Sequence, residues 1–168
     1  GTVAVGDLPA LRAQRTVTQV VLVEGRNHAR LYEPAESPPA GFERSPATLA
    51  NLAAHDARLK DPRSAESEQP AYALNERRSR REDIAVLIAT CTHLGCLPKQ
   101  HFEPGDVVLG TDWPGGFLCP CHGSRFDMAG RVFNGSPAST NLRIPPYSFP
   151  TENTLIIGQD ESAAQGAA

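Results

Sequence analysis

Two short stretches hold all four cysteines of the 168-residue chain and two of its five histidines. The first reads Cys91-Thr92-His93-Leu94-Gly95-Cys96, and the second reads Cys119-Pro120-Cys121-His122-Gly123-Ser124. Each stretch opens on a cysteine, has a histidine close behind it and contains a second cysteine. Thiolate sulfur and imidazole nitrogen are the ligand pair shared by zinc sites and iron–sulfur sites. The pattern therefore predicts a metal centre built from both stretches.

Three interpretations compete for these residues. Two structural disulfides would use every cysteine but would leave the matching histidines unexplained. A structural zinc site accepts the same ligands, but zinc motifs usually have two cysteines with two to four residues between them or two histidines with three to five residues between them at both ends, whereas the spacings here are C-x-H-x2-C and C-x-C-H. A Rieske-type 2Fe–2S centre takes two cysteines on one iron and two histidines on the other. We favour this third interpretation and keep the other two open.

A count of formal charge explains why such a centre would use histidine. Two ferric ions and two sulfides sum to plus two. Four thiolates would bring the site to minus two, whereas two thiolates and two neutral imidazoles leave it at zero. An electron enters a neutral site more easily, and Rieske centres as a class have potentials of about −150 to +300 mV. The imidazoles also couple the electron to a proton, because a ferric ion lowers the pKa of a bound imidazole and reduction weakens that effect.

The two stretches resemble the cluster-binding motifs of the Rieske iron–sulfur proteins of bacterial cytochrome bc complexes. Both motifs are complete and in the right order, and the resemblance covers about residues 59–158. Further matching segments are Asn75-Glu76-Arg77-Arg78, Trp113, Gly115-Gly116, Gly130-Arg131-Val132 and Asn141-Leu142-Arg143-Ile144-Pro145. The resemblance implies a mainly β Rieske fold, with antiparallel base sheets, an inserted small β subdomain that binds the cluster, and one helix in an insertion.

The resemblance also implies a role for each ligand. Cys91 and Cys119 would ligate the inner iron, and His93 and His122 would ligate the outer iron at an exposed tip. By analogy with the family, His122 would hydrogen-bond the quinol that is oxidised there, with His93 as the less favoured candidate. Both histidines are therefore the candidate catalytic residues.

Four further residues would support the cluster. By the resemblance, Cys96 and Cys121 form a disulfide that joins the two loops and contributes roughly 3–4 kcal/mol. Low-potential Rieske ferredoxins usually lack this cysteine pair. Ser124 occupies the position of a serine whose hydroxyl reaches a bridging sulfide. Phe126 replaces a tyrosine of high-potential relatives that donates to a cysteine ligand, so we expect a lower potential here.

Three residues are expected on the docking surface at the tip. Leu94 and Gly95 belong to the first stretch, and Leu94 would be an exposed apolar side chain. Pro137 belongs to a segment, 135–138, that resembles the family's proline-containing loop over the cluster. Ser136 separates the glycine from the proline here, whereas family members commonly have the two side by side.

The function implied is electron transfer from ubiquinol, bound against a cytochrome b subunit, to a c-type cytochrome. The isolated domain would be an electron carrier of a quinol–cytochrome c reductase, without turnover of its own. The main alternative is the Rieske subunit of a molybdenum oxidase such as arsenite oxidase, and a zinc-stabilised binding module is a weaker one.

Composition restricts the setting. A net charge of −3 gives no basic surface for nucleic acid. Cysteines divided between a disulfide and metal thiolates suit an oxidising compartment. The longest apolar run, 84–89, is strand-length rather than the roughly 20 residues of a membrane span, and no signal-peptide pattern opens the chain. Because family members carry an N-terminal anchor, we expect a soluble fragment of a membrane-anchored protein on the periplasmic side of a bacterial inner membrane.

The expected organisation follows the family. Residues 1–88 form the base subdomain with a helical insertion at about 45–59, residues 89–144 bind the cluster, 145–158 return as closing strands, and 159–168 form a flexible tail.

Several other side chains are interpreted as structural. His55 is expected on the surface of the inserted helix, and His101 is expected to be exposed because both histidine ligand positions are filled. The charged segment 77–83 is expected to be a solvated run with internal ion pairs. Residues 107–109 are expected to form a short strand.

Overall fold

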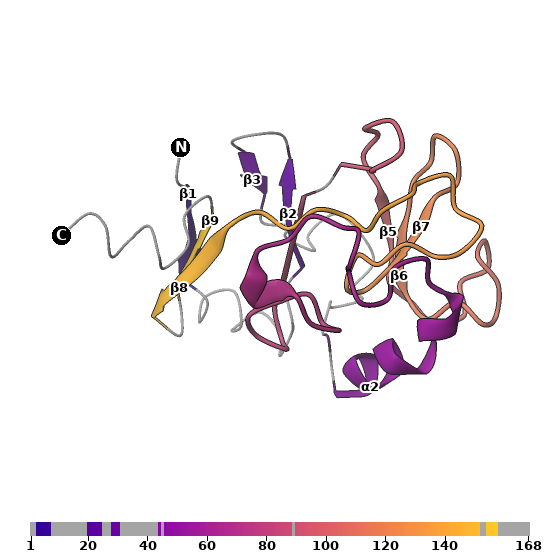
Figure 1. The fold of residues 1–168 in the computed structure, drawn as a ribbon, viewed down its shortest axis with the longest axis horizontal. Helices are drawn as coiled ribbons and strands as arrows, with labels where there is room; N and C mark the ends of the chain where they lie inside the picture. Colours follow the sequence, from indigo (N-terminus) through magenta and orange to yellow (C-terminus); the bar gives the residue numbers. More distant parts are fainter. Residues whose placement is uncertain are drawn as a thin grey trace.

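The structure is a computed structural model that describes residues 3–7, 20–24, 28–30, 44, 46–88, 90–151 and 154–157. In this part of the chain the strands form three three-stranded sheets, in the orders β1-β9-β8, β3-β2-β4 and β5-β6-β7 (Figure 1). The strands are β1 (Val3–Asp7), β2 (Val20–Glu24), β3 (His28–Arg30), β4 (Ala85–Ile88), β5 (Lys99–His101), β6 (Gly116–Leu118), β7 (Arg125–Asp127), β8 (Tyr147–Thr151) and β9 (Thr154–Ile157). The expected fold class, mainly β with a helix in an insertion, is confirmed.

The first two sheets are built from β1 to β4 and from β8 and β9. β9 lies between β1 and β8 and is antiparallel to both. β2 is antiparallel to β3 but parallel to β4, which departs from the expected all-antiparallel base. Parallel neighbours need a long connection between them, and here that connection contains β3 and the whole helical insertion. β1 includes Gly6 and Asp7, although glycine and aspartate are disfavoured in strands.

The insertion before β4 contains helix α2 (Pro46–Ala54) and the short 3-10 helices η2 (Asp56–Arg58) and η3 (Ala71–Ala73). Proline is tolerated in the first turn of a helix because its missing N–H would have no partner there. Ser45, which precedes α2, lies outside the described residues. Leu52 is the buried side chain of α2 and joins the main core. The insertion therefore packs onto the protein interior instead of standing apart from it.

The third sheet carries the two cysteine- and histidine-containing loops at one end. β5 and β6 are antiparallel, with Gln100 opposite Phe117, and β6 and β7 are antiparallel, with Phe117 opposite Phe126. The first loop precedes β5 and the second joins β6 to β7, so both lie at the same end of the sheet. Gly116 is required in β6, since a Cβ there would lie 1.9 Å from the carbonyl oxygen of Phe126.

The core connects this sheet to the base. Phe117 and Phe126 from the third sheet and Val86 and Leu87 from β4 are all fully buried in one cluster. β4 leads directly toward the first loop, and the N–H of Ile88 donates to the carbonyl of Arg143 at 2.8 Å. One continuous apolar core therefore packs against both β4 and the sheet that carries the two loops.

The connection between β5 and β6 lies at the end of the sheet opposite to the two loops. Residues 107–109 form a turn there and not the expected strand, because Asp106 Oδ1 accepts the N–H groups of Val108 (2.7 Å) and Leu109 (3.1 Å). No helix in the described part of the chain has the length and apolar character to cross a membrane. The expected flexible tail at 159–168 lies outside the described residues.

Candidate metal centre

The first loop is a closed turn held by its own backbone. The N–H of Cys91 donates to the carbonyl of Cys96 at 2.7 Å, and the N–H of Gly95 donates back to the carbonyl of Cys91 at 3.0 Å. Gly95 has φ +86°, a conformation that glycine adopts readily and that costs other residues energy. His93 lies midway along this turn.

The second loop repeats the same turn. The N–H of Cys119 donates to the carbonyl of Ser124 at 2.8 Å, and the N–H of Gly123 donates to the carbonyl of Cys119 at 3.0 Å. Gly123 has φ +81°. Cys119 therefore occupies the same place in its loop as Cys91, and His122 follows one position later than His93 does.

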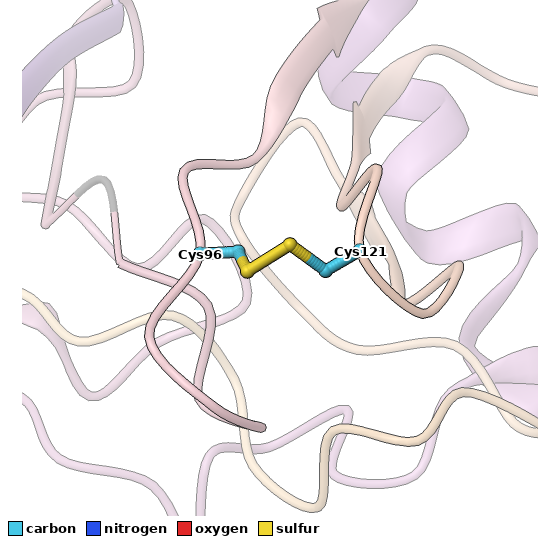
Figure 2. The surroundings of a disulfide bond; sticks show 2 residues. All are labelled: Cys96 and Cys121. Carbon is cyan, nitrogen blue, oxygen red and sulfur yellow. A yellow bond between two sulfur atoms is a disulfide. The ribbon is translucent and has the colours of Figure 1, made fainter.

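A disulfide between Cys96 and Cys121 joins the two loops, as the family resemblance implied, and Figure 2 shows it bridging them. Their Cα atoms lie 6.5 Å apart. The sulfur of Cys119 lies within 4.8 Å of both disulfide sulfurs. Cys91 and Cys119 are free thiols, so the interpretation with two structural disulfides is wrong.

The four candidate ligands separate into a buried pair and an outer pair. Cys91 and Cys119 are each only 2 % exposed, and their side chains hydrogen-bond to each other. His122 is exposed and His93 is partly exposed, with ring centroids 4.9 Å apart. His93 Nδ1 is a buried ring nitrogen with no hydrogen-bond partner in the described part of the chain. Two adjacent thiols and an unpartnered imidazole nitrogen fit the donor set of a 2Fe–2S cluster with mixed ligands.

The Cys91 thiol needs a metal to become a thiolate. Burial raises its pKa above the ordinary value, while hydrogen bonds from the backbone of His93 and from the Ser124 side chain lower it in part. A metal ion stabilises the deprotonated sulfur of a coordinating thiol. The site is therefore suited to a bound cation and poorly suited to a free thiolate.

Ser124 and Phe126 differ in what they offer the site. Ser124 is fully buried, and its Oγ accepts the N–H of Ala138 at 2.9 Å, so its hydroxyl proton remains available to a sulfur atom. Phe126 is also fully buried but has no polar atom. Ser124 is the only one of the two with a hydrogen to donate.

The segment 135–140, which contains the expected proline-containing segment 135–138 and is called the proline loop below, is held by several hydrogen bonds. Ser136, the residue that separates the glycine from the proline, is buried, and its Oγ accepts the N–H of Arg125 at 3.0 Å. Thr92 Oγ1 donates to the carbonyl of Thr140 at 2.6 Å, which ties this loop to the first one. Pro137 itself is exposed.

The docking residues expected at the tip are on the surface. Leu94 is 69 % exposed, and Gly95 is exposed beside it. Leu97, which the sequence interpretation did not name, is 48 % exposed in the same segment. The first loop thus presents apolar surface to solvent.

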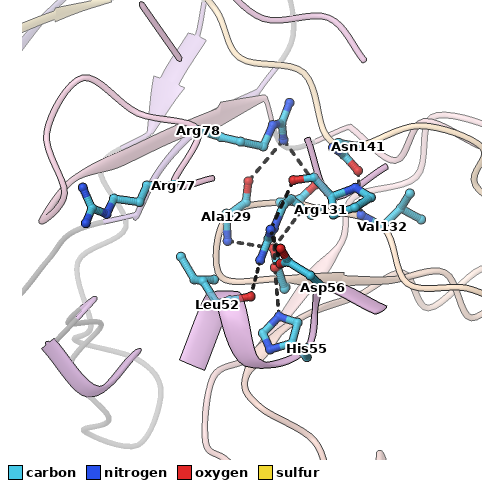
Figure 3. Close-up of polar contacts among 12 residues, drawn as sticks. Leu52, His55, Asp56, Arg77, Arg78, Ala129, Arg131, Val132 and Asn141 are labelled. Carbon is cyan, nitrogen blue, oxygen red and sulfur yellow. Dashed lines mark hydrogen bonds and ion pairs between the residues drawn. The ribbon is translucent and has the colours of Figure 1, made fainter. Parts of the chain in front are cut away.

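A buried polar network lies next to this sheet and was missed from the sequence (Figure 3). Asp127, fully buried in β7, accepts hydrogen bonds from the N–H groups of Ala129 and Arg131 and from Arg131 Nε. Its Oδ2 lies 3.0 Å from His55 Nε2. His55 is only 6 % exposed, so its expected surface position is wrong. Arg131 also reaches the carbonyl of Leu52 at 2.7 Å and fixes α2 to the site.

The charged segment 77–83 divides into two parts. Its expected internal ion pairs are present, between Arg77 and Glu82 and between Arg81 and Asp83. Arg78, however, is fully buried and donates to the carbonyls of Ala129, Gly130 and Leu142. Burial lowers its pKa to about 10, so it stays charged at neutral pH. The solvated-run interpretation is therefore wrong for this residue.

His101 lies away from the two loops, as expected for a histidine that is not a ligand, but it is partly buried instead of exposed. Its Nδ1 lies 2.9 Å from Asp106 Oδ2, and its carbonyl accepts the indole N–H of Trp113.

Comparisons with known proteins agree with this geometry. A family model described as Rieske [2Fe-2S] domain matches residues 50–147, more than half of the chain. The chain is 50 % identical over 121 residues to the ubiquinol-cytochrome c reductase iron-sulfur subunit of Allochromatium vinosum, covering 72 % of this chain and 58 % of the relative. The subunit of the same name from Rhodospirillum rubrum is 41 % identical over 102 residues, which cover 61 % of this chain and 51 % of the relative. The mitochondrial cytochrome b-c1 complex subunit Rieske of Neurospora crassa is 46 % identical over 81 residues, 48 % of this chain and 31 % of the relative. The chain spans little more than half the length of the two bacterial relatives.

Proposed function

The chain belongs to the Rieske [2Fe-2S] domain family, and from this premise we propose that it carries single electrons from ubiquinol to a c-type cytochrome within a bacterial cytochrome bc complex. Its cofactor is a Rieske-type 2Fe–2S cluster with two cysteine and two histidine ligands. One observation carries the proposal: two buried thiols and two more exposed imidazoles lie on disulfide-linked loops whose outer surface includes the exposed Leu94.

In this proposal the ligands are the residues expected from the sequence. Cys91 and Cys119, both buried, bind the inner iron. His93 and His122 bind the outer iron, and the unpartnered buried nitrogen of His93 supports its assignment. When bound, the cluster would accept and release one electron, and with its four ligands it would have a formal charge of zero when oxidised.

The exposed imidazole gives the site its proton chemistry. His122 offers a ring nitrogen to solvent or to a partner, so it is the residue proposed to accept the hydrogen bond of the quinol hydroxyl. Quinol oxidation releases protons together with electrons, and an imidazole in contact with the quinol would be placed to take up one of these protons. His93 is less accessible and is the second choice for this role.

The partners follow from the names of the relatives. Their iron–sulfur subunits belong to ubiquinol–cytochrome c reductase, which supports a cytochrome b subunit and a c-type cytochrome as partners and the periplasmic side of the bacterial inner membrane as the location. The same names favour this function over a molybdenum oxidase subunit. In the zinc alternative the protein would be colourless, whereas the cluster absorbs visible light.

Two measurements test the proposal. A redox titration of the purified holoprotein, followed by EPR and visible spectra, is expected to give a positive potential at neutral pH that falls at alkaline pH. A negative, pH-independent potential would remove the quinol role.

The second measurement is ubiquinol–cytochrome c turnover, by the isolated domain and by a bc complex in which this sequence replaces the soluble part of the resident iron–sulfur subunit. We expect turnover from the complex and none from the domain alone. Turnover by the domain alone, or an inactive complex that contains the cluster, would contradict the proposal.

A further inference from the structure

The orientation of the Ser124 hydroxyl is decided by a residue of the proline loop. Ser124 Oγ accepts the N–H of Ala138 at 2.9 Å. A hydroxyl has a single proton, and an oxygen that accepts on one side keeps that proton for an acceptor on another. The Ser124 side chain makes its other hydrogen bond with the Cys91 sulfur. The position of the Ala138 peptide therefore determines whether the hydroxyl proton points at the sulfur.

The backbone of Ala138 is also held on its other side, through the carbonyl of the following peptide group, by a lysine from outside the cluster-binding sheet. Lys60 Nζ donates to the carbonyl of Ala138 at 2.8 Å and also to the carbonyl of Ser136. The two carbonyls flank Pro137, so one ammonium group spans the turn of the loop. Charged donors make stronger hydrogen bonds than neutral ones, and this contact links the loop to the helical insertion.

The backbone of Lys60 is itself fixed. Its N–H donates to the carbonyl of Val132 at 2.9 Å, the N–H of Asn134 donates to the carbonyl of Arg58 at 2.8 Å, and Leu59 and Phe133 form an antiparallel bridge between these contacts. The lysine therefore extends from a short two-stranded ladder and not from a free loop.

We propose that Lys60 is a positioning residue for the cluster: by holding the proline loop through Ser136 and Ala138, it directs the Ser124 hydroxyl toward the sulfur of Cys91, a proposed ligand, and thereby raises the reduction potential. A hydrogen bond donated to a ligand sulfur stabilises the more negative reduced cluster. This proposal rests on the ligand assignment made above, but it does not depend on the identity of the electron donor or acceptor.

Loss of the lysine is expected to change orientation without unfolding the loop. The proline loop keeps its contacts from Ser136 Oγ to Arg125 and from Thr92 to Thr140. Lys60→Met retains the length of the aliphatic chain and removes the ammonium group. Lys60→Arg retains a charged donor. Ser124→Ala removes the hydroxyl that the lysine is proposed to position.

The test is a double-mutant cycle read as the midpoint potential of the holoprotein. Lys60→Met is expected to lower the potential in the same direction as Ser124→Ala, by a roughly threefold change in the ratio of reduced to oxidised cluster, or about 30 mV. In the Ser124→Ala background, Lys60→Met is expected to have no further effect, because the hydroxyl is already gone. Lys60→Arg, which keeps a charged donor, is expected to have a midpoint potential close to that of the wild-type protein.

A matched control separates positioning from simple charge. Lys99→Met removes the same charge from an exposed lysine of β5 for which the structure shows no side-chain hydrogen bond to a described residue, and it is expected to leave the potential within about 10 mV of wild type. If Lys60→Met lowers the potential equally with and without Ser124, the lysine acts as a charge and the proposal is overturned. An unchanged potential in Lys60→Met also overturns it.

One further readout and one substitute variant keep the outcomes distinct. The EPR spectrum of the reduced wild-type protein tests the ligand assignment, independently of the cycle. Should Lys60→Met fail to retain the cluster, Lys60→Leu, which likewise has no donor, takes its place in the cycle and is read in the same way.

Discussion

His55 and Asp127 lie side by side in the interior, with His55 Nε2 3.0 Å from Asp127 Oδ2, although 72 residues separate them in the chain. His55 lies in the segment that follows α2, and Asp127 is the last residue of β7. The N–H groups of Ala129 and Arg131 also donate to the Asp127 carboxylate. The carboxylate also receives Arg131 Nε at 2.8 Å. This network thus joins the helical insertion to the strand that leaves the second loop.

Asp127→Asn is expected to destabilise the protein by about 3 kcal/mol, because it removes the fully buried one of the two carboxylates that pair with Arg131 and leaves only the more exposed Asp56. Urea unfolding followed by far-UV circular dichroism measures the change. Asp112→Asn is the matched control: it breaks an ion pair with Arg58 in which both side chains are exposed, and we expect about 0.5 kcal/mol or less. Similar losses in the two variants would show that the buried pair has no special role.

The same carboxylate predicts a component of acid denaturation. Burial alone would raise the pKa of Asp127, but the hydrogen bond from His55 and the charge of Arg131 outweigh burial, so the pKa lies below its ordinary value. A depressed carboxyl pKa adds stability that is complete above the unfolded value of about 3.9 and is lost as the pH falls below it. We therefore expect the unfolding free energies of wild type and Asp127→Asn to converge between about pH 4 and pH 2. Parallel curves over that interval would be inconsistent with a depressed pKa.

Phe126→Tyr is expected to raise the reduction potential. Phe126 is fully buried in β7 beside the second loop, and a tyrosine hydroxyl at this position would donate to a cysteine ligand as it does in high-potential relatives. A hydrogen bond of about 1 kcal/mol corresponds to about 40 mV for one electron. Phe149→Tyr, in β8 of the base, provides the control and should leave the potential unchanged. A potential that stays the same or falls in Phe126→Tyr would exclude this explanation of the substitution.

The presence of a metal centre could be anticipated from the sequence because the candidate ligands are local. Each loop carries its own cysteine and histidine within four residues, and the family resemblance, not the spacing alone, favoured a 2Fe–2S cluster over zinc. The buried network could not be predicted from the sequence, because it depends on contacts between distant segments. Nothing near His55 in the sequence reveals its partner Asp127. Arg78 was hidden inside a run of charges for the same reason. The aspartate and glycine that precede Arg131 are a local turn signal, and that signal could have pointed to a buried Asp127.

The turn at 107–109 illustrates a different limit. Two valines and a leucine favour a strand by propensity, but a single preceding side chain, Asp106, satisfies the backbone N–H groups of Val108 and Leu109 and closes a turn instead. Side-chain hydrogen bonds of aspartate to nearby backbone compete directly with strand pairing. Apolar composition alone does not show which of the two prevails.

Leu94 offers the sharpest test of docking, because it is exposed and lies next to a ligand without being one. Its side chain is 69 % exposed on the first loop, so truncation to alanine removes apolar surface from the tip with little effect on folding. If the tip binds the quinol-oxidising pocket of the cytochrome b subunit, Leu94→Ala should lower turnover of the assembled complex about tenfold, equivalent to about 1.4 kcal/mol of lost binding. The midpoint potential and EPR spectrum of the holoprotein should stay as in wild type. Val107→Ala, fully exposed at the opposite end of the sheet, is the control and should leave turnover unchanged. Equal losses in both variants would place the docking surface elsewhere, whereas a loss in Leu94→Ala together with a shifted potential would mean that Leu94 acts on the cluster and not on the partner.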